Sequence, residues 1–141
     1  MKRIPQLHPL SMEHHLSLVL ANKAIKTARS GDQAAIDALA REIAADFPER
    51  WERHFHNEET TVFRMLDDHE DGPRAQTEAL RRQHDEMREM ARRLASGDTT
   101  VLEDFGVLLR DHTRLEEREL FPIAERLLGD EELDEVLART R

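Results

Sequence analysis

Turn-forming residues divide this chain into four long segments. Glycine beside serine, aspartate or proline favours a turn, and it occurs in this setting at Ser30-Gly31-Asp32, Asp71-Gly72-Pro73 and Ser96-Gly97-Asp98. Between these turns β-branched residues are scarce and apolar residues recur every three or four positions, which predicts amphipathic helices. The four predicted helices cover residues 11–29, 32–69, 73–95 and 98–128.

Short turns make consecutive helices antiparallel, so we expect an all-α fold, an antiparallel up-down-up-down four-helix bundle in one domain over residues 1–141. A loose helical array is the alternative. Residues 1–10 form an N-terminal arm in this interpretation, and the tail 130–141 adds a short helical turn or two. Pro48 lies inside the second helix and disfavours helical geometry at the preceding residue, which predicts a kink or break there.

The composition excludes several classes of function. The chain has no cysteine, which removes disulfides, zinc ribbons and iron–sulfur clusters, so any metal must be held by nitrogen and oxygen. The formal net charge of -9 disfavours a phosphate-binding surface and therefore nucleic acid as a partner. No apolar stretch is long enough for a signal peptide or a membrane span, so we expect a cytoplasmic protein with no membrane partner.

One motif occurs twice in the chain. Glu58 follows His54 by four residues, and Glu116 follows His112 by four, and each pair continues with a second glutamate and later an apolar residue before phenylalanine. Residues four apart in a helix lie one turn apart on the same face. An imidazole over a carboxylate is half of a metal site, and two copies in one helical protein can close such a site from opposite sides.

Helical periodicity places one histidine of each helix on its apolar face. At His54 and His112 an imidazole and a carboxylate interrupt an apolar stripe, and His14 and His84 lie between apolar residues at the same spacing. His15 competes with His14 but is turned towards polar residues. The remaining histidines are predicted to be solvated, and they are His8, His56 and His69.

One His-x-x-x-Glu pair is weak evidence for metal, because surface salt bridges use the same spacing and a lone inward histidine is usually a hydrogen-bonded core residue. Four imidazoles and two carboxylates facing one core are different, since burying them together is costly unless a cation neutralises and coordinates them. Two carboxylates can bridge two ions and histidines can terminate them, which fits a dinuclear iron or manganese centre. Zinc accepts the same ligands.

As a set, these motifs resemble the hemerythrin-like, or HHE cation-binding, domain family. The resemblance covers nearly the whole chain: a first-helix histidine after Leu-Ser-x-Glu, HFxxEE on the second helix, a third-helix histidine, and HxxxEExxLFP on the fourth. It implies an antiparallel four-helix bundle around two non-haem iron ions, with a mild kink at Pro122 in the last motif. By position, Glu58 and Glu116 would bridge the irons, and the terminal ligands would be His14, His54, His84 and His112.

The chain departs from the oxygen-carrying members of that family at two points. Those proteins have a His-x-x-x-His pair on the third helix, whereas Leu80 and Arg88 flank His84 here, and their fourth-helix carboxylate is an aspartate five residues after the histidine rather than a glutamate at four. One imidazole is therefore missing. Water, Glu59 or Glu119 are the candidates for its place, and water would leave a labile position that favours reaction over reversible oxygen binding.

Three hypotheses for function follow. The first is a di-iron protein that binds or senses oxygen, peroxide or nitric oxide, or that handles iron. The second is a small peroxidase or oxidase with the same centre, in which Trp51 would replace the absent tyrosine as a radical relay. The third is a metal-independent helical interaction module. A second apolar face on the first helix suits a homodimer or another partner, and consists of Met12, Leu16, Val19 and Leu20.

Overall fold

The computed structural model describes residues 3–141, and all of its regular elements are helical. A 3-10 turn, η1 (Pro5–Leu7), leads into α1 (His8–Arg29). The second stretch runs without interruption through α2 (Gln33–Asp46), η2 (Phe47–Trp51), α3 (Glu52–Glu58), η3 (Glu59–Phe63) and α4 (Arg64–Asp67). The third is α5 (Arg74–Ala95). After the 3-10 turn η4 (Thr99–Val101), the fourth comprises α6 (Leu102–Leu115), η5 (Glu116–Leu120) and α7 (Phe121–Leu127), and α8 (Asp130–Thr140) follows.

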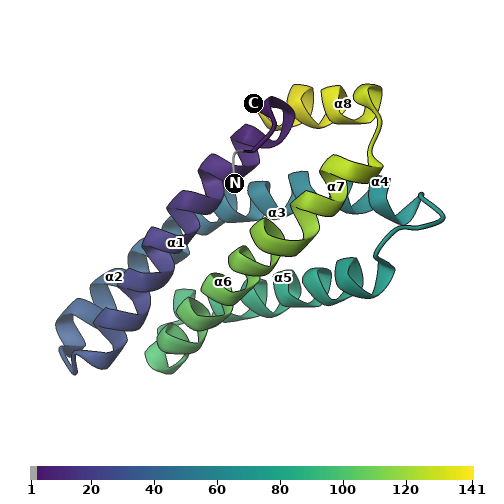
Figure 1. Cartoon of the computed structure of the whole chain (residues 1–141). Coiled ribbons are helices and arrows are strands. Elements are labelled where there is room, and N and C mark those ends of the chain that lie inside the picture. The colour runs from purple at the N-terminus through teal and green to yellow at the C-terminus, as the bar shows by residue number, and fades with distance from the viewer. Residues whose placement is uncertain (1–2) are drawn as a thin grey trace.

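The long helices lie side by side along one another (Figure 1). α1 packs most extensively against α6, and α5 contacts both α2 and α6. Gly106 of α6 permits the close approach of α1, because a Cβ atom at this position would lie 2.9 Å from the carbonyl oxygen of Ala21. α8 crosses the end of the molecule at which α1 begins and contacts η1. Among residues 3–141, no helix has both the length and the apolar character needed to cross a membrane.

Two hydrophobic clusters fill the interior, and a layer of buried polar residues separates them. The first cluster contains Phe47, Phe55 and Phe105 with their neighbours, and the second contains Phe63 and Phe121 with theirs. Along each long stretch, the buried histidine falls between residues of the first cluster and residues of the second. The helices therefore bring their inward histidines to the same level of the molecule.

The all-α prediction is confirmed, with two differences at the ends of the chain. α1 begins at His8, and Pro9 fits its first turn because the missing N–H would have no helical partner there. The tail forms an α-helix of 11 residues rather than a turn or two. This helix is stabilised by Leu133 and Val136, which are buried in the second cluster. Residues 3–141 thus contain five helical stretches and not the expected four.

The sequence predicts a kink or break near Pro48, and the helix does not end there but continues through the proline. Phe47 keeps right-handed helical torsion angles, φ -56° and ψ -48°. The backbone changes instead to π-type hydrogen bonding over η2, where the Glu52 N–H donates to the Phe47 carbonyl. In a regular α-helix the proline ring would clash with the carbonyl four residues earlier. The wider π turn allows the helix to continue past the proline.

The second apolar face of α1 is exposed in three of its four residues. Met12, Leu16 and Val19 are 54%, 46% and 56% exposed, respectively. Leu20 instead packs against the first hydrophobic cluster. The apolar patch is therefore narrower than the sequence indicates, and a homodimer through it stays a prediction.

Candidate metal centre

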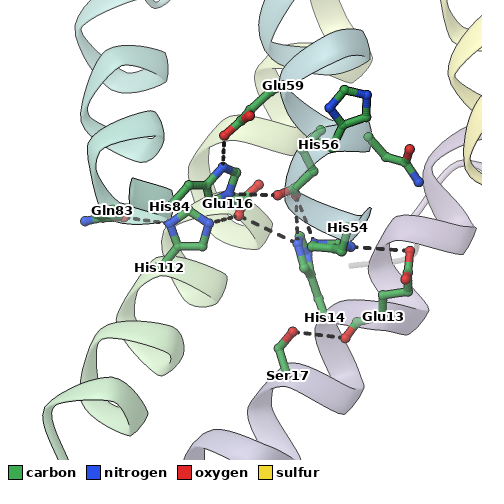
Figure 2. Close-up of polar contacts among 12 residues, drawn as sticks. Glu13, His14, Ser17, His54, His56, Glu59, Gln83, His84, His112 and Glu116 are labelled. Carbon is green, nitrogen blue, oxygen red and sulfur yellow. Dashed lines mark hydrogen bonds and ion pairs between the residues drawn. The ribbon is translucent and has the colours of Figure 1, made fainter. Parts of the chain in front are cut away.

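The inward histidines and Glu116 meet in the polar layer (Figure 2), and Glu58 lies among them. Each of these side chains is at most 2% exposed. The other histidines lie elsewhere: His8, His15 and His56 are exposed, and the partly exposed His69 pairs with Glu132. The structure therefore brings together all six side chains that the sequence singles out, and they are His14, His54, Glu58, His84, His112 and Glu116.

Their donor atoms form two groups that share Glu58. One group adds His14 and His54, the other adds His84, His112 and Glu116, and within each group the donor atoms lie within 4.8 Å of one another. Nε2 of His14 and Nε2 of His54 lie 3.0 and 3.4 Å from Oε2 of Glu58. Nε2 of His84 lies 3.2 Å from the other oxygen, Oε1. Each oxygen of Glu58 thus faces a different group, as a carboxylate that bridges two ions requires.

Glu116 occupies the corresponding place on the opposite side. Its Oε1 is in close contact with Nε2 of His112, one helical turn earlier, and lies 3.7 Å from Nε2 of His14. The second carboxylate therefore also lies between a histidine of one group and a histidine of the other. Two carboxylates and four imidazoles surround the shared space.

One π turn begins directly after Glu58, and another begins at Glu116. Glu58 ends α3 directly before η3, and Glu116 is the first residue of η5. Such turns hold one extra residue and are frequent at functional sites. Within η3, the Thr60 and Thr61 hydroxyls donate to backbone carbonyls four residues earlier, at 2.8 and 2.6 Å. These side chains give the carbonyls of a widened helix their hydrogen-bond partners.

The π turn η5 explains two features of the fourth stretch. Pro122 has no N–H to donate into the helix, and Arg3 donates instead to the carbonyl of Glu117 at 3.3 Å. The extra residue also changes the helical phase, so that Glu119 is exposed although a regular helix would turn it towards the site. Glu119 is therefore not in a position to replace the missing imidazole.

The second ring nitrogen of each histidine, Nδ1, points away from the shared space towards a side-chain oxygen. The Nδ1 atoms of His14 and His84 hydrogen bond with Glu117 and Glu59 at 2.6 and 2.7 Å. Nδ1 of His112 hydrogen bonds with the side-chain oxygen of Gln83 at 2.7 Å, and Nδ1 of His54 lies 3.3 Å from Oε1 of Glu13. A partner at Nδ1 orients the ring and leaves the Nε2 lone pair for a metal.

These outer contacts follow the repeat in the sequence. The second glutamate of each motif, Glu59 or Glu117, binds the histidine of a neighbouring helix. Gln83 directly precedes His84 and contacts His112. In the same way, Glu13 directly precedes His14 and contacts His54. The sequence reasoning missed Glu13, Gln83 and Glu117 as outer partners, although the doubled glutamate in both motifs is a signal that could have revealed part of the set.

The pKa values of the two carboxylates in the metal-free site are shifted in opposite directions. Burial opposes the charge on Glu58, but its positive neighbour His54 and several hydrogen bonds hold the pKa of Glu58 well below its ordinary value. Burial and the nearby charge of Glu58 raise the pKa of Glu116 well above the ordinary value. Only one of the two carboxylates is therefore readily ionised without a bound cation.

The histidines differ in the same way. Burial alone would lower the pKa of His54, but the charges of Glu58 and Glu13 raise it to about 10. Burial, together with repulsion from His84, lowers the pKa of His112 well below its ordinary value. Burial and repulsion between like charges therefore disfavour the charged forms of Glu116 and His112. A bound cation would stabilise the ionised carboxylates.

Missing hydrogen bonds indicate that the donor set fits a metal. Among the described residues, seven buried side-chain nitrogen or oxygen atoms have no hydrogen-bond partner, and six of these belong to the cluster. They include Nε2 of His84, Nε2 of His112 and both oxygens of Glu116. Leaving such atoms without a partner costs about 1–3 kcal/mol each. Coordination of a cation in the shared space would satisfy five of the six, all except Nδ1 of His54, which faces Glu13. Nitrogen and oxygen donors suit iron, manganese or zinc.

Comparison with known families agrees with this geometry. The hemerythrin HHE cation binding domain matches residues 7–124. The chain belongs to this hemerythrin family. All six clustered residues lie within the matched range. A search of curated proteins and a search of solved structures returned no significant match.

The residues at which this hemerythrin-family chain departs from the oxygen carriers do not supply a further donor. Leu80 is fully buried in the second hydrophobic cluster. Arg88 binds Glu52 and Glu59 outside the shared space. Glu59 hydrogen bonds with Nδ1 of His84, on the side of the ring away from the other donor atoms. Of the candidates for the missing ligand, water is the one that these contacts leave open.

Proposed function

We propose that this hemerythrin-family domain holds a non-haem di-iron centre and uses it to bind or sense oxygen, peroxide or nitric oxide, or to handle iron. The observation that carries the proposal is the position of Glu58, whose two oxygens face two separate groups of histidines. The buried atoms without hydrogen-bond partners support it independently.

In this proposal each side chain has a defined task. Glu58 and Glu116 would be shared by the two ions, His14 and His54 would hold one of them, and His84 and His112 would hold the other. Iron would supply redox chemistry and an exchangeable coordination position. The chain supplies fixed ligands, outer partners that orient them, and walls formed by two hydrophobic clusters.

The same proposal extends to the fold. The four long stretches would form the antiparallel four-helix bundle that surrounds the centre, with α8 as an addition at one end. The pairing of α1 with α6, and of α5 with both α2 and α6, supports this arrangement. In such a bundle every long stretch can contribute one histidine at the same level. Each of the four long stretches does have one buried histidine.

Metal content and absorption spectra test the function. The wild-type protein, reduced and loaded with Fe²⁺ without oxygen, should hold two irons per chain and develop an oxo-bridged di-iron absorption band when oxygen is admitted. Glu58→Gln should lose both irons, whereas His56→Gln is the matched control because His56 is an exposed histidine on the same helix. Two irons retained in Glu58→Gln would refute the site, and a colourless protein holding only zinc would refute the redox function.

A further inference from the structure

His84 is held on both ring faces and at its outer nitrogen. Phe55 stacks on the ring with centroids 4.1 Å apart and planes 13° apart, and Phe63 lies 5.4 Å away at 15°. Phe55 belongs to the first hydrophobic cluster and Phe63 to the second, so the imidazole lies between the two. Nδ1 of His84 hydrogen bonds with Glu59 at 2.7 Å. Its orientation therefore depends chiefly on Phe55, Phe63 and Glu59.

Arg88 contacts two of these three residues. It lies one helical turn after His84 on α5, and its Nη1 and Nη2 donate to the Glu59 carboxylate at 3.0 and 3.1 Å. Its guanidinium carbon lies 5.7 Å from the centre of the Phe55 ring. The same side chain thus touches both the hydrogen-bond partner and the nearer stacking partner of His84.

The guanidinium of Arg88 is itself fixed on all sides. Nε and Nη2 donate to the two oxygens of Glu52, both at 2.8 Å, and Nη1 also donates to Asp85 at 3.0 Å. With the two bonds to Glu59, all five N–H groups have an acceptor. The side chain is 17% exposed. Arginine suits such a place because its planar fork binds carboxylates bidentately.

The corresponding histidine of the other group lacks this arrangement. The Glu117 carboxylate, which binds His14, accepts from the Ser11 hydroxyl at 2.9 and 3.1 Å rather than from an arginine. Leu18 occupies the position one turn after His14. Arg3 lies 5.9 Å from the ring centre of Phe121, but its hydrogen bond goes to the Glu117 backbone carbonyl. The two halves of the site therefore differ in how one histidine is supported.

We propose that Arg88 is a positioning residue for His84. By fixing Glu59 and Phe55 it keeps the proton of His84 on Nδ1 and the ring plane constant, so that Nε2 faces the shared space. Metal uptake at the position of His84 and His112 then depends on Arg88, whereas uptake at the position of His14 and His54 does not. This inference rests on the proposed metal centre.

A titration with Co²⁺, followed by its visible absorption, tests the dependence on Arg88. In Arg88→Met the affinity for one of the two ions should fall by about tenfold to a hundredfold, the usual effect of losing an outer partner, while the other ion binds as in wild type. Arg92→Met is the matched control, because Arg92 lies on the same helix, is 68% exposed and, within residues 3–141, pairs only with Glu89. Unchanged affinities for both ions, or an equal fall for both, would overturn the proposal.

The tautomer of His84 in the metal-free protein gives a second readout, which a general loss of stability would not change. ¹⁵N NMR of the imidazole should show the proton on Nδ1 in wild type and a mixture of tautomers in folded Arg88→Met. In a Glu59→Gln background the Arg88 substitution should change the tautomer little further, because Arg88 controls the Nδ1 proton through Glu59 and the ring plane through Phe55. Identical tautomers in wild type and Arg88→Met would overturn the inference. A wild type that binds no metal would refute the proposed function, while the NMR result would still decide whether Arg88 positions His84.

Discussion

Metal uptake by this site should release protons, so the apparent affinity should fall as the pH falls. In the metal-free protein burial disfavours the charged form of His54, but Glu58 and Glu13 outweigh burial and raise its pKa to about 10. At neutral pH His54 is therefore protonated on both nitrogens. A metal can bind Nε2 only after that proton has left. Burial and the charge of Glu58 give Glu116 a second proton to release, because they raise its pKa.

The size of the effect follows from the pKa of His54. Below a pKa of about 10, each unit of pH changes the deprotonated fraction of this imidazole tenfold. Between pH 8.5 and pH 6.5, His54 alone should weaken metal binding about a hundredfold, which corresponds to about 2.7 kcal/mol. The proton on Glu116 can only increase this dependence. An ordinary imidazole, with a pKa near 6.5, would weaken binding only about twofold over the same interval.

Calorimetric titration with Zn²⁺ in buffers of different ionisation enthalpy measures both the affinity and the number of protons released. At least one proton per chain should be released throughout the interval from pH 6.5 to pH 8.5. His56→Gln, which alters an exposed histidine on the same helix, should leave the pH dependence unchanged. Constant affinity across this interval would show that Glu58 and Glu13 do not hold His54 protonated, and would refute the reasoning.

Two further predictions concern packing. Gly106→Ala should lower the free energy of unfolding of the metal-free protein by about 1–3 kcal/mol in urea titrations, because the new Cβ would lie 2.9 Å from both the Ala21 carbonyl oxygen and Cγ1 of Ile25. Gly129→Ala, whose Cβ would have no neighbour nearer than 3.9 Å, should change it by less than about 0.5 kcal/mol, and equal losses would contradict this account. If α1 forms a homodimer, Val19→Glu should give monomers in sedimentation velocity; a monomeric wild type would remove that interface.

The inward position of each clustered histidine could be predicted because it depends only on helical periodicity. His14 and His15 are adjacent in sequence, yet a rotation of 100° per residue separates a buried side chain from an exposed one. The same rule fails at Glu119, because the π turn η5 adds a residue and changes the phase. Sequence patterns give no direct sign of such a turn.

The outer partners of the histidines could not be predicted in the same way. Gln83 meets His112 and Arg88 meets Glu59 across different helices, so these contacts depend on the rotation and spacing of packed helices. The helix α8 was underestimated for a related reason. Leu133 and Val136 stand in a mostly charged tail, and they stabilise a helix only because the second cluster is in place to bury them.

The extensive packing of α1 against α6 has a consequence for the order in which the protein matures. The chain between them, which includes α2 to α5, must be synthesised before α1 meets its main neighbour. Until then α1 has only its smaller contacts with α2 and α3. The larger group of donor atoms also lacks His112 and Glu116, which lie on α6 and η5. A ribosome-bound fragment that ends before α6 therefore cannot complete the paired site, and occupancy of both positions would be a property of the finished chain.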